Sequence, residues 1–191
     1  MDNGKKNKFL DAIWISDSLF NRNKVSGSSA NISFKHEDKI YISGTNTCFG
    51  RLTQNDFSTI SLEGEHIGGI KPSKELQMHL ILYNNNPNTN AVIHVHSFYS
   101  TLWSCIEHED VYDIIHSPTP YLEMKLGKIT LVEYGKPGTE ELFSNLKNRL
   151  NKGNGYILKN HGPIVAGTDL MSAFYSLEEL EESTKIAWFL R

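Results

Sequence analysis

Asn90-Ala-Val-Ile-His-Val-His-Ser97 is the stretch that decides the fold of this 191-residue chain. It is rich in β-branched residues and follows a turn-forming run, Asn84-Asn-Asn-Pro-Asn88, so it predicts a strand that leaves a loop. Because side chains alternate between the two faces of a strand, we expect His94 and His96 to share one face with Val92. The opposite face would comprise Ala91, Ile93 and Val95.

Two imidazoles on one strand face can bind a single cation. Imidazole is the commonest neutral nitrogen ligand of zinc, and a catalytic zinc usually has three protein ligands and one open position. Packed histidines or surface histidines would give the same pattern, and periodicity alone does not distinguish these interpretations of His94 and His96.

Two other segments favour the metal interpretation. His161 lies where an apolar strand runs into the turn Gly162-Pro163, a place from which a third imidazole can reach a cleft. Glu75 begins a predicted helix for which Ser73 would be the cap. The helix dipole by itself also favours a carboxylate in a first turn, so a purely structural role for Glu75 stays open.

Three ordered motifs resemble those of the class II aldolase/adducin family. They are Lys71-Pro-Ser-Lys-Glu75, His94-Val-His-Ser97 and Lys159-Asn-His-Gly162. The resemblance extends from about Asp11 to Arg191 and includes small-residue loops at 26–33 and 42–45.

This resemblance implies an α/β fold with a metal site. The expected fold is a single class II aldolase-like domain over residues 1–191, with residues 1–8 flexible and three layers, in which helices flank a central mixed or antiparallel sheet. The family also implies a homotetramer with sites between subunits and one Zn²⁺, or another divalent metal, per subunit. The implied metal ligands are Glu75, His94, His96 and His161.

The family further implies a loop system that binds a substrate phosphate. Its expected members are Ala30, Asn31, Ser43, Gly44, Ser73 and Lys74. From the residues alone, the loop 25–31 is better explained as a plain helix-to-strand connection than as an anion-binding loop. Fuculose-phosphate aldolases of the family have Ser where this chain has Lys74, and a lysine beside an anion site would suit a substrate with an additional carboxylate.

Glu75 and Tyr121 are the implied catalytic residues. Glu75 would carry a proton to or from the reaction intermediate, and Tyr121 would reach a neighbouring subunit's site as a proton donor. A buried aromatic role for Tyr121 is an equal alternative. His79 lies one helical turn after Glu75 and is expected to be a packed, hydrogen-bonded histidine rather than a site residue.

The implied reaction is carbon–carbon bond cleavage in a small phosphorylated sugar or sugar acid through a metal-chelated enediolate. The motifs are most similar to those of enzymes that decarboxylate a 3-oxo-tetronate 4-phosphate to dihydroxyacetone phosphate. An aldolase of the L-fuculose-1-phosphate type is the second expectation. The non-enzymatic alternative is an interaction domain of the adducin type, which has the fold but lacks a working metal site.

Composition and charge indicate which kinds of partner and which cellular location to expect. A formal net charge of −3 and a pI near 6.2 leave no basic stripe, so no nucleic-acid partner is expected. No apolar run approaches the roughly 20 residues of a membrane span, and the N-terminus lacks a signal peptide's apolar centre. Cys48 and Cys105 provide no disulfide framework, so a cytoplasmic location is expected.

Hydrophobic spacing predicts the remaining elements. We expect a first helix over 9–20 with Leu10 and Trp14 on its apolar face, and a final helix capped by Asp169. The acidic run Glu178–Glu182 in that last helix is predicted to be mostly a solvated face. Between these helices the expected elements are a hairpin of 32–34 with 39–43, strands at 56–64 and 129–134, and helices at 76–83, 98–105 and 139–150.

Overall fold

A central sheet organises the chain in the computed structural model, which describes residues 3–151 and 153–191. Within these residues eight strands form one sheet in the order β4-β3-β2-β1-β5-β8-β7-β6. The strands are β1 (Asn31–His36), β2 (Lys39–Ser43), β3 (Phe57–Ser61), β4 (His66–Gly69), β5 (Ala91–His94), β6 (Thr130–Val132), β7 (Gly155–Leu158) and β8 (Gly162–Gly167). Only β6 and β7 pair in parallel among these strands, so the sheet is mixed, as predicted.

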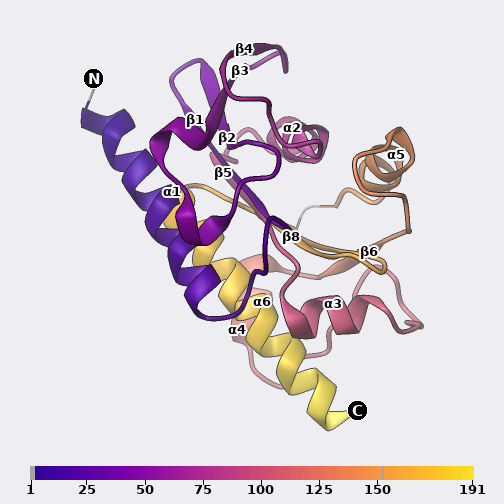
Figure 1. Cartoon of the computed structure of the whole chain (residues 1–191). Coiled ribbons are helices and arrows are strands. Elements are labelled where there is room, and N and C mark those ends of the chain that lie inside the picture. The colour runs from indigo at the N-terminus through magenta and orange to yellow at the C-terminus, as the bar shows by residue number, and fades with distance from the viewer. Residues whose placement is uncertain (1–2, 152) are drawn as a thin grey trace.

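Helices cover both faces of the sheet, which gives the three-layer α/β architecture predicted from the sequence (Figure 1). One layer contains α1 (Asn3–Asn21), α3 (Phe98–Ser104), α4 (Tyr121–Leu126) and α6 (Leu170–Leu190). The other contains α2 (Leu76–Asn85) and α5 (Glu140–Asn148). Two short 3-10 helices, Phe49–Arg51 and Gln54–Asp56, precede β3.

The strand β5 lies in the middle of the sheet and separates the two cores. Ala91, Ile93 and Val95 are buried in the core beneath α1 and α6, whereas Val92 is buried in the core beneath α2 and α5. The predicted alternation of faces is therefore confirmed. The regular strand ends at His94, three residues before the end of the predicted stretch.

Local sequence signals erred at three places. The helix α1 begins at Asn3 and so extends into the segment expected to be flexible. Leu10 and Trp14 are 55% and 54% exposed, because α1 buries the face that carries Phe9 and Ile15 instead. Ser73 is not the helix cap: α2 is capped at Glu75, whose backbone N–H donates to the Ser73 hydroxyl at 3.3 Å.

The strand β4 and the helix α4 were not predicted from the sequence. Asp169 caps α6 as predicted and accepts a hydrogen bond from the Ser172 backbone N–H at 2.7 Å. None of the helices in the described residues is long and apolar enough to cross a membrane.

Candidate metal centre

The end of β5 and the β7–β8 turn bring three imidazoles together. The strands β5 and β8 are antiparallel neighbours with His94 opposite Ile164, so the turn that carries His161 lies beside the end of β5. The rings of His94, His96 and His161 have pairwise centroid distances of 5.1, 4.8 and 4.7 Å. One ligand atom from each ring lies within 4.8 Å of those of the other two.

The turn has its shape because residue 162 is a glycine. Gly162 has φ +154°, and a Cβ added there would lie 2.5 Å from the Val95 carbonyl oxygen. A side chain would thus push the His161 turn away from the β5 segment. The close approach of the two backbones is what lets imidazoles distant in sequence meet.

The hydrogen bonds of these rings fit a bound cation. The His94 Nδ1–H donates to the Pro163 carbonyl oxygen at 2.8 Å, so Nε2 carries the lone pair of the ring and faces His96 Nε2 at 3.2 Å. Both ring nitrogens of His161 are buried and make no hydrogen bond within the described residues. An unpartnered buried imidazole is costly, and a cation is the ligand that suits several converging nitrogens.

The protonation state of the cluster also fits metal binding. Burial lowers the pKa of His94, His96 and His161 below the ordinary value of 6.5. The mutual proximity of the rings and the positive charge of Lys74 lower the pKa of His161 further. Neutral imidazole is the form that binds a metal, so the cluster is ready to bind a cation at neutral pH.

Glu75 places a carboxylate against the cluster. Its Oε2 is 3.5 Å from His94 Nε2, and its Oε1 is 3.4 Å from His161 Nε2. The side chain is 6% exposed, and Asn31 Nδ2 donates to Oε2 at 2.9 Å. Four candidate ligands therefore share one location, three imidazoles and one carboxyl group.

A chain of hydrogen bonds leads from the core to Glu75. The Asn31 amide donates to Glu75, so its oxygen must accept from the Nε2–H of His79. The Nδ1 of that neutral ring then accepts from the Ser33 hydroxyl at 2.7 Å, and Ser33 accepts from the Tyr83 hydroxyl at 2.7 Å. His79 is thus packed and hydrogen-bonded, as predicted, and it fixes which end of the Asn31 amide faces Glu75.

A cavity of about 330 Å³ opens beside this cluster. His96, His161 and Glu75 line it, together with the segments 28–31, 44–46 and 73–74. The 44–46 segment is held to the segment before α2 because Thr45 N–H donates to the Lys71 carbonyl at 3.0 Å and Gly44 bridges to Pro72.

Most of the residues predicted to bind phosphate line this cavity. They are Ala30, Asn31, Gly44, Ser73 and Lys74. Ser43 does not line it: its hydroxyl is buried and accepts from the Ile32 backbone N–H at 3.2 Å. Tyr121 is 56% exposed on α4, which contradicts the buried aromatic interpretation, and it is not among the cavity residues of its own chain.

Sequence reasoning missed several residues that line the cavity. They are Ser28, Ser29, Thr45, Asn46 and Pro137. The first four are neighbours of predicted residues in the same small-residue loops, so a loop-wide prediction would have included them. Pro137 comes from the turn after β6, and only the folded arrangement brings it to the site.

Comparison with known proteins identifies the family to which the chain belongs. The family model described as Class II Aldolase and Adducin N-terminal domain matches residues 11–188. A 3-oxo-tetronate 4-phosphate decarboxylase of Pectobacterium atrosepticum is 40% identical over 174 residues, which cover 91% of this chain and 80% of that protein. An L-fuculose phosphate aldolase of Methanocaldococcus jannaschii is 38% identical over 168 residues, which cover 88% of each.

A solved structure is similar over most of the chain. The crystal structure of YgbL from Escherichia coli superposes with a TM-score of 0.91 at 36% identity. The match covers 95% of this chain and 88% of that one.

We expect His161→Ala to lose stoichiometric metal, because the substitution removes one of three converging nitrogens. The affinity for zinc should fall by more than the roughly 10–100-fold cost of losing an outer-shell partner. Metal analysis after dialysis, with circular dichroism to check the fold, measures this effect. The matched control is His116→Ala at an exposed histidine, which should retain the metal. A folded His161→Ala chain with full metal would contradict the ligand assignment.

His79 should make the stability of the metal-free protein depend on pH. Burial lowers its pKa from 6.5 to about 3, so below pH 6.5 the unfolded chain binds a proton that the folded chain excludes. The free energy of unfolding of the wild type should therefore fall as pH falls, by about 1.4 kcal/mol per pH unit more than that of His79→Gln. Denaturant titrations between pH 6 and pH 4 measure the two slopes. Above pH 7 the slopes should coincide, and equal slopes at acid pH would contradict the neutral, buried His79.

Proposed function

We propose that this chain, which belongs to the class II aldolase and adducin family and is a lyase, decarboxylates a 3-oxo-tetronate 4-phosphate. The product of the proposed reaction is dihydroxyacetone phosphate, and the reaction would use a bound divalent cation. The observation that carries this proposal is the convergence of three imidazoles and a carboxyl group beside a cavity that Lys74 also lines. Zinc is the cation that three neutral imidazoles favour.

The residues that would hold the cation are His94, His96 and His161, with Glu75 as a fourth ligand before substrate binds. When bound, a divalent cation supplies a Lewis acid that polarises a carbonyl oxygen and stabilises negative charge. Such charge develops only as the carbon–carbon bond breaks, so its stabilisation accelerates that step. An adducin-like domain without a working site would not need this cluster, which argues for catalysis.

Glu75 is the residue we propose for proton transfer. When carbon dioxide leaves, the bonding electron pair stays on the adjacent carbon as an enediolate, which needs one proton to become dihydroxyacetone phosphate. The Glu75 carboxyl group lines the cavity, and Asn31 orients it through the hydrogen bond to Oε2. It can deliver that proton and recover it from water.

The small-residue loops would bind the phosphate. Segments 28–31 and 44–46 surround the cavity with backbone amides and short polar side chains, groups that commonly cradle an anion. Phosphate held there would fix the reacting carbons beside the imidazoles, which is the positioning part of catalysis.

Lys74 is the residue we propose for recognising the carboxylate that leaves. Its side chain lies against Gly138 of the turn after β6, where an added Cβ would meet it at 3.0 Å. Lys74 lines the same cavity as His96 and His161, and its positive charge contributes to lowering the pKa of both imidazoles. A cation at this place would pair with a carboxylate next to the metal site.

We further propose that the chain forms a homo-oligomer, with the family's homotetramer as the expected form. Large apolar side chains are exposed on the helices of one layer, among them Phe98 on α3, Met124 on α4 and Phe189 on α6. Exposed apolar groups of this size favour contact with another protein surface. Tyr121 lies on the same layer, so the prediction that it reaches a neighbouring subunit's site remains part of this proposal.

A coupled assay for dihydroxyacetone phosphate, run alongside carbon dioxide detection, tests the reaction. We expect a 3-oxo-tetronate 4-phosphate to yield both products and L-fuculose 1-phosphate to yield little. Glu75→Gln is the matched variant, and its turnover should fall by at least about 100-fold because a proton-transfer group contributes about 10²–10⁴. Release of an aldehyde from L-fuculose 1-phosphate without carbon dioxide release from the sugar acid would favour the aldolase, which the 38% identity to such an enzyme makes the second candidate.

Lys74→Ser should discriminate between substrates. A hydrogen bond to a charged group contributes about 1.5–3 kcal/mol, so kcat/KM for the carboxylated substrate should fall by about 10–100-fold. L-fuculose 1-phosphate has no carboxylate that could pair with Lys74, so its kcat/KM should change little. Kinetics with both substrates measure the ratio, and an equal loss for both would contradict the role of Lys74.

A further inference from the structure

Glu181 is a buried carboxylate in the middle of an acidic run. The prediction that this run is a solvated face was wrong at Glu181, which is 1% exposed, whereas the Glu182 side chain is 53% exposed. Burying a carboxylate is costly unless hydrogen bonds and a positive charge compensate it. The contacts of Glu181 therefore indicate what its burial stabilises.

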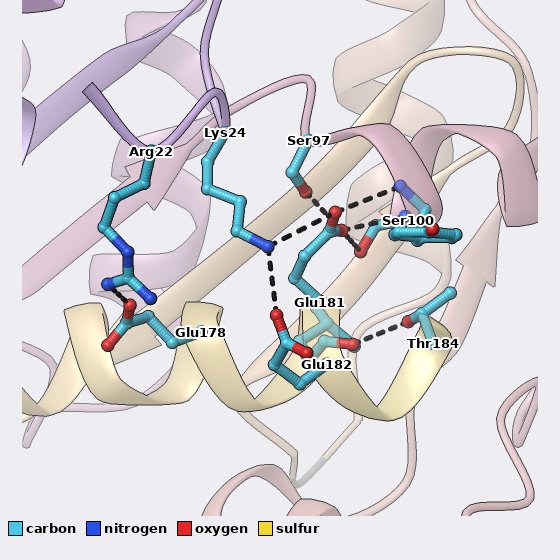
Figure 2. Close-up of polar contacts among 10 residues, drawn as sticks. Arg22, Lys24, Ser97, Ser100, Glu178, Glu181, Glu182 and Thr184 are labelled. Atoms are coloured by element: carbon cyan, nitrogen blue, oxygen red, sulfur yellow. Dashed lines mark hydrogen bonds and ion pairs between the residues drawn. The ribbon is translucent and has the colours of Figure 1, made fainter. Parts of the chain in front are cut away.

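Among the residues that the structure describes, the four hydrogen bonds to this carboxylate come from one short segment (Figure 2). Oε2 accepts from the Ser97 hydroxyl at 2.7 Å, and from the Ser100 backbone N–H at 2.9 Å and hydroxyl at 2.7 Å. Oε1 accepts from the Tyr99 backbone N–H at 3.0 Å. Both oxygens thus accept hydrogen bonds from the start of α3.

Glu181 acts as the cap of a helix to which it does not belong. Tyr99 and Ser100 are the second and third residues of α3, and N–H groups at these positions have no partner inside the helix. Ser97 occupies the cap position but makes no side-chain capping bond, because its hydroxyl donates to Glu181. The carboxylate from α6 satisfies these N–H groups and complements the positive end of the helix.

This cap lies next to the candidate metal ligand His96. The strand β5 ends at His94 and α3 begins at Phe98, so His96 lies in a short link outside both elements. On one side of His96, the Val95 backbone N–H donates to the Pro163 carbonyl oxygen at 3.2 Å. On the other side, Ser97 is held by Glu181 at 2.7 Å.

The same turn of α6 also contacts Lys24, the residue before the loop 25–31. Figure 2 shows Lys24 directed towards Glu181 and Glu182. Its Nζ lies 3.2 Å from Glu182 Oε1 and 3.8 Å from Glu181 Oε1. Lys24 immediately precedes the loop 25–31, of which residues 28–31 line the cavity. One carboxylate therefore contacts the flanks of both the imidazole cluster and the proposed phosphate loop.

We propose that Glu181 is a positioning residue for the metal centre: it holds the link that carries His96 in the geometry that binds the cation. Glu181 is not among the residues that line the cavity, so it acts through Ser97 and the first turn of α3. The inference rests on the proposed metal site and adds to it a determinant of metal affinity on a distant helix.

Glu181→Gln tests this inference, because glutamine keeps the size of the side chain but turns an N–H₂ group towards donors. We expect the dissociation constant for zinc, measured by chelator competition on the metal-free chain, to rise about tenfold, in the range for an outer-shell partner. The absorption spectrum of the cobalt-substituted protein should also shift, since ligand geometry changes. Glu182→Gln and Glu178→Gln are matched controls in which only the ion pairs with Lys24 and Arg22 are lost, and both should bind zinc within twofold of the wild type.

A purely structural role would give a different result. If Glu181→Gln lowers the unfolding temperature but binds zinc as tightly as the wild type with an unchanged cobalt spectrum, the inference is overturned. If that variant does not fold, Ser97→Ala removes one of its contacts, and unchanged zinc affinity in folded Ser97→Ala overturns the inference equally. A wild-type chain that binds no zinc overturns the proposed metal-dependent function as well, so the two failures are distinguishable.

Discussion

The antiparallel register of β5 against β8 is the constraint on which the site depends. With His94 opposite Ile164, the β7–β8 turn is fixed beside the end of β5. The His161 ring therefore lies against the rings of His94 and His96. A one-residue slip would turn His94 towards the opposite core, because side-chain faces alternate. The hydrophobic residues on both faces of β5 prevent such a slip, since each face has its own buried core. The register that buries the two faces of β5 is thus also the register that brings the imidazoles together.

Buried polar groups then specify the site in more detail than the sheet can. The series from Tyr83 through Ser33, His79 and Asn31 to Glu75 has one consistent direction of donation. Burial raises the pKa of Tyr83 and lowers that of His79, so each group stays in the neutral form that this direction needs. A fully satisfied network of this kind rigidifies the groups it contains. The carboxylate beside the imidazoles is accordingly oriented from within the core.

The sequence predicted the parts of the molecule that local patterns control. The alternation in residues 91–95 and the cap at Asp169 depend only on residues that are close in sequence. The structure agrees with both predictions. Burial of Glu181 was missed, because an acidic run at helical spacing looks solvated unless the donors of a distant helix start are known. Pro137 was missed for the same reason, as its place at the cavity depends on tertiary contacts. The proposed ligand set could be named from the sequence because three motifs in fixed order resemble one family, whereas His-x-His alone left alternatives open.

The two edge strands of the sheet, β4 and β6, affect which surface of the chain can mediate association with another copy. β4 has four residues and β6 has three, so each presents few free backbone groups to an incoming strand. Short edge strands discourage the growth of a sheet from one molecule to the next, the route by which β-rich proteins aggregate. Association would then have to use the helical layers, where side chains rather than backbone hydrogen bonds choose the partner. Such a surface can evolve new contacts one residue at a time without exposing the sheet to fibre formation.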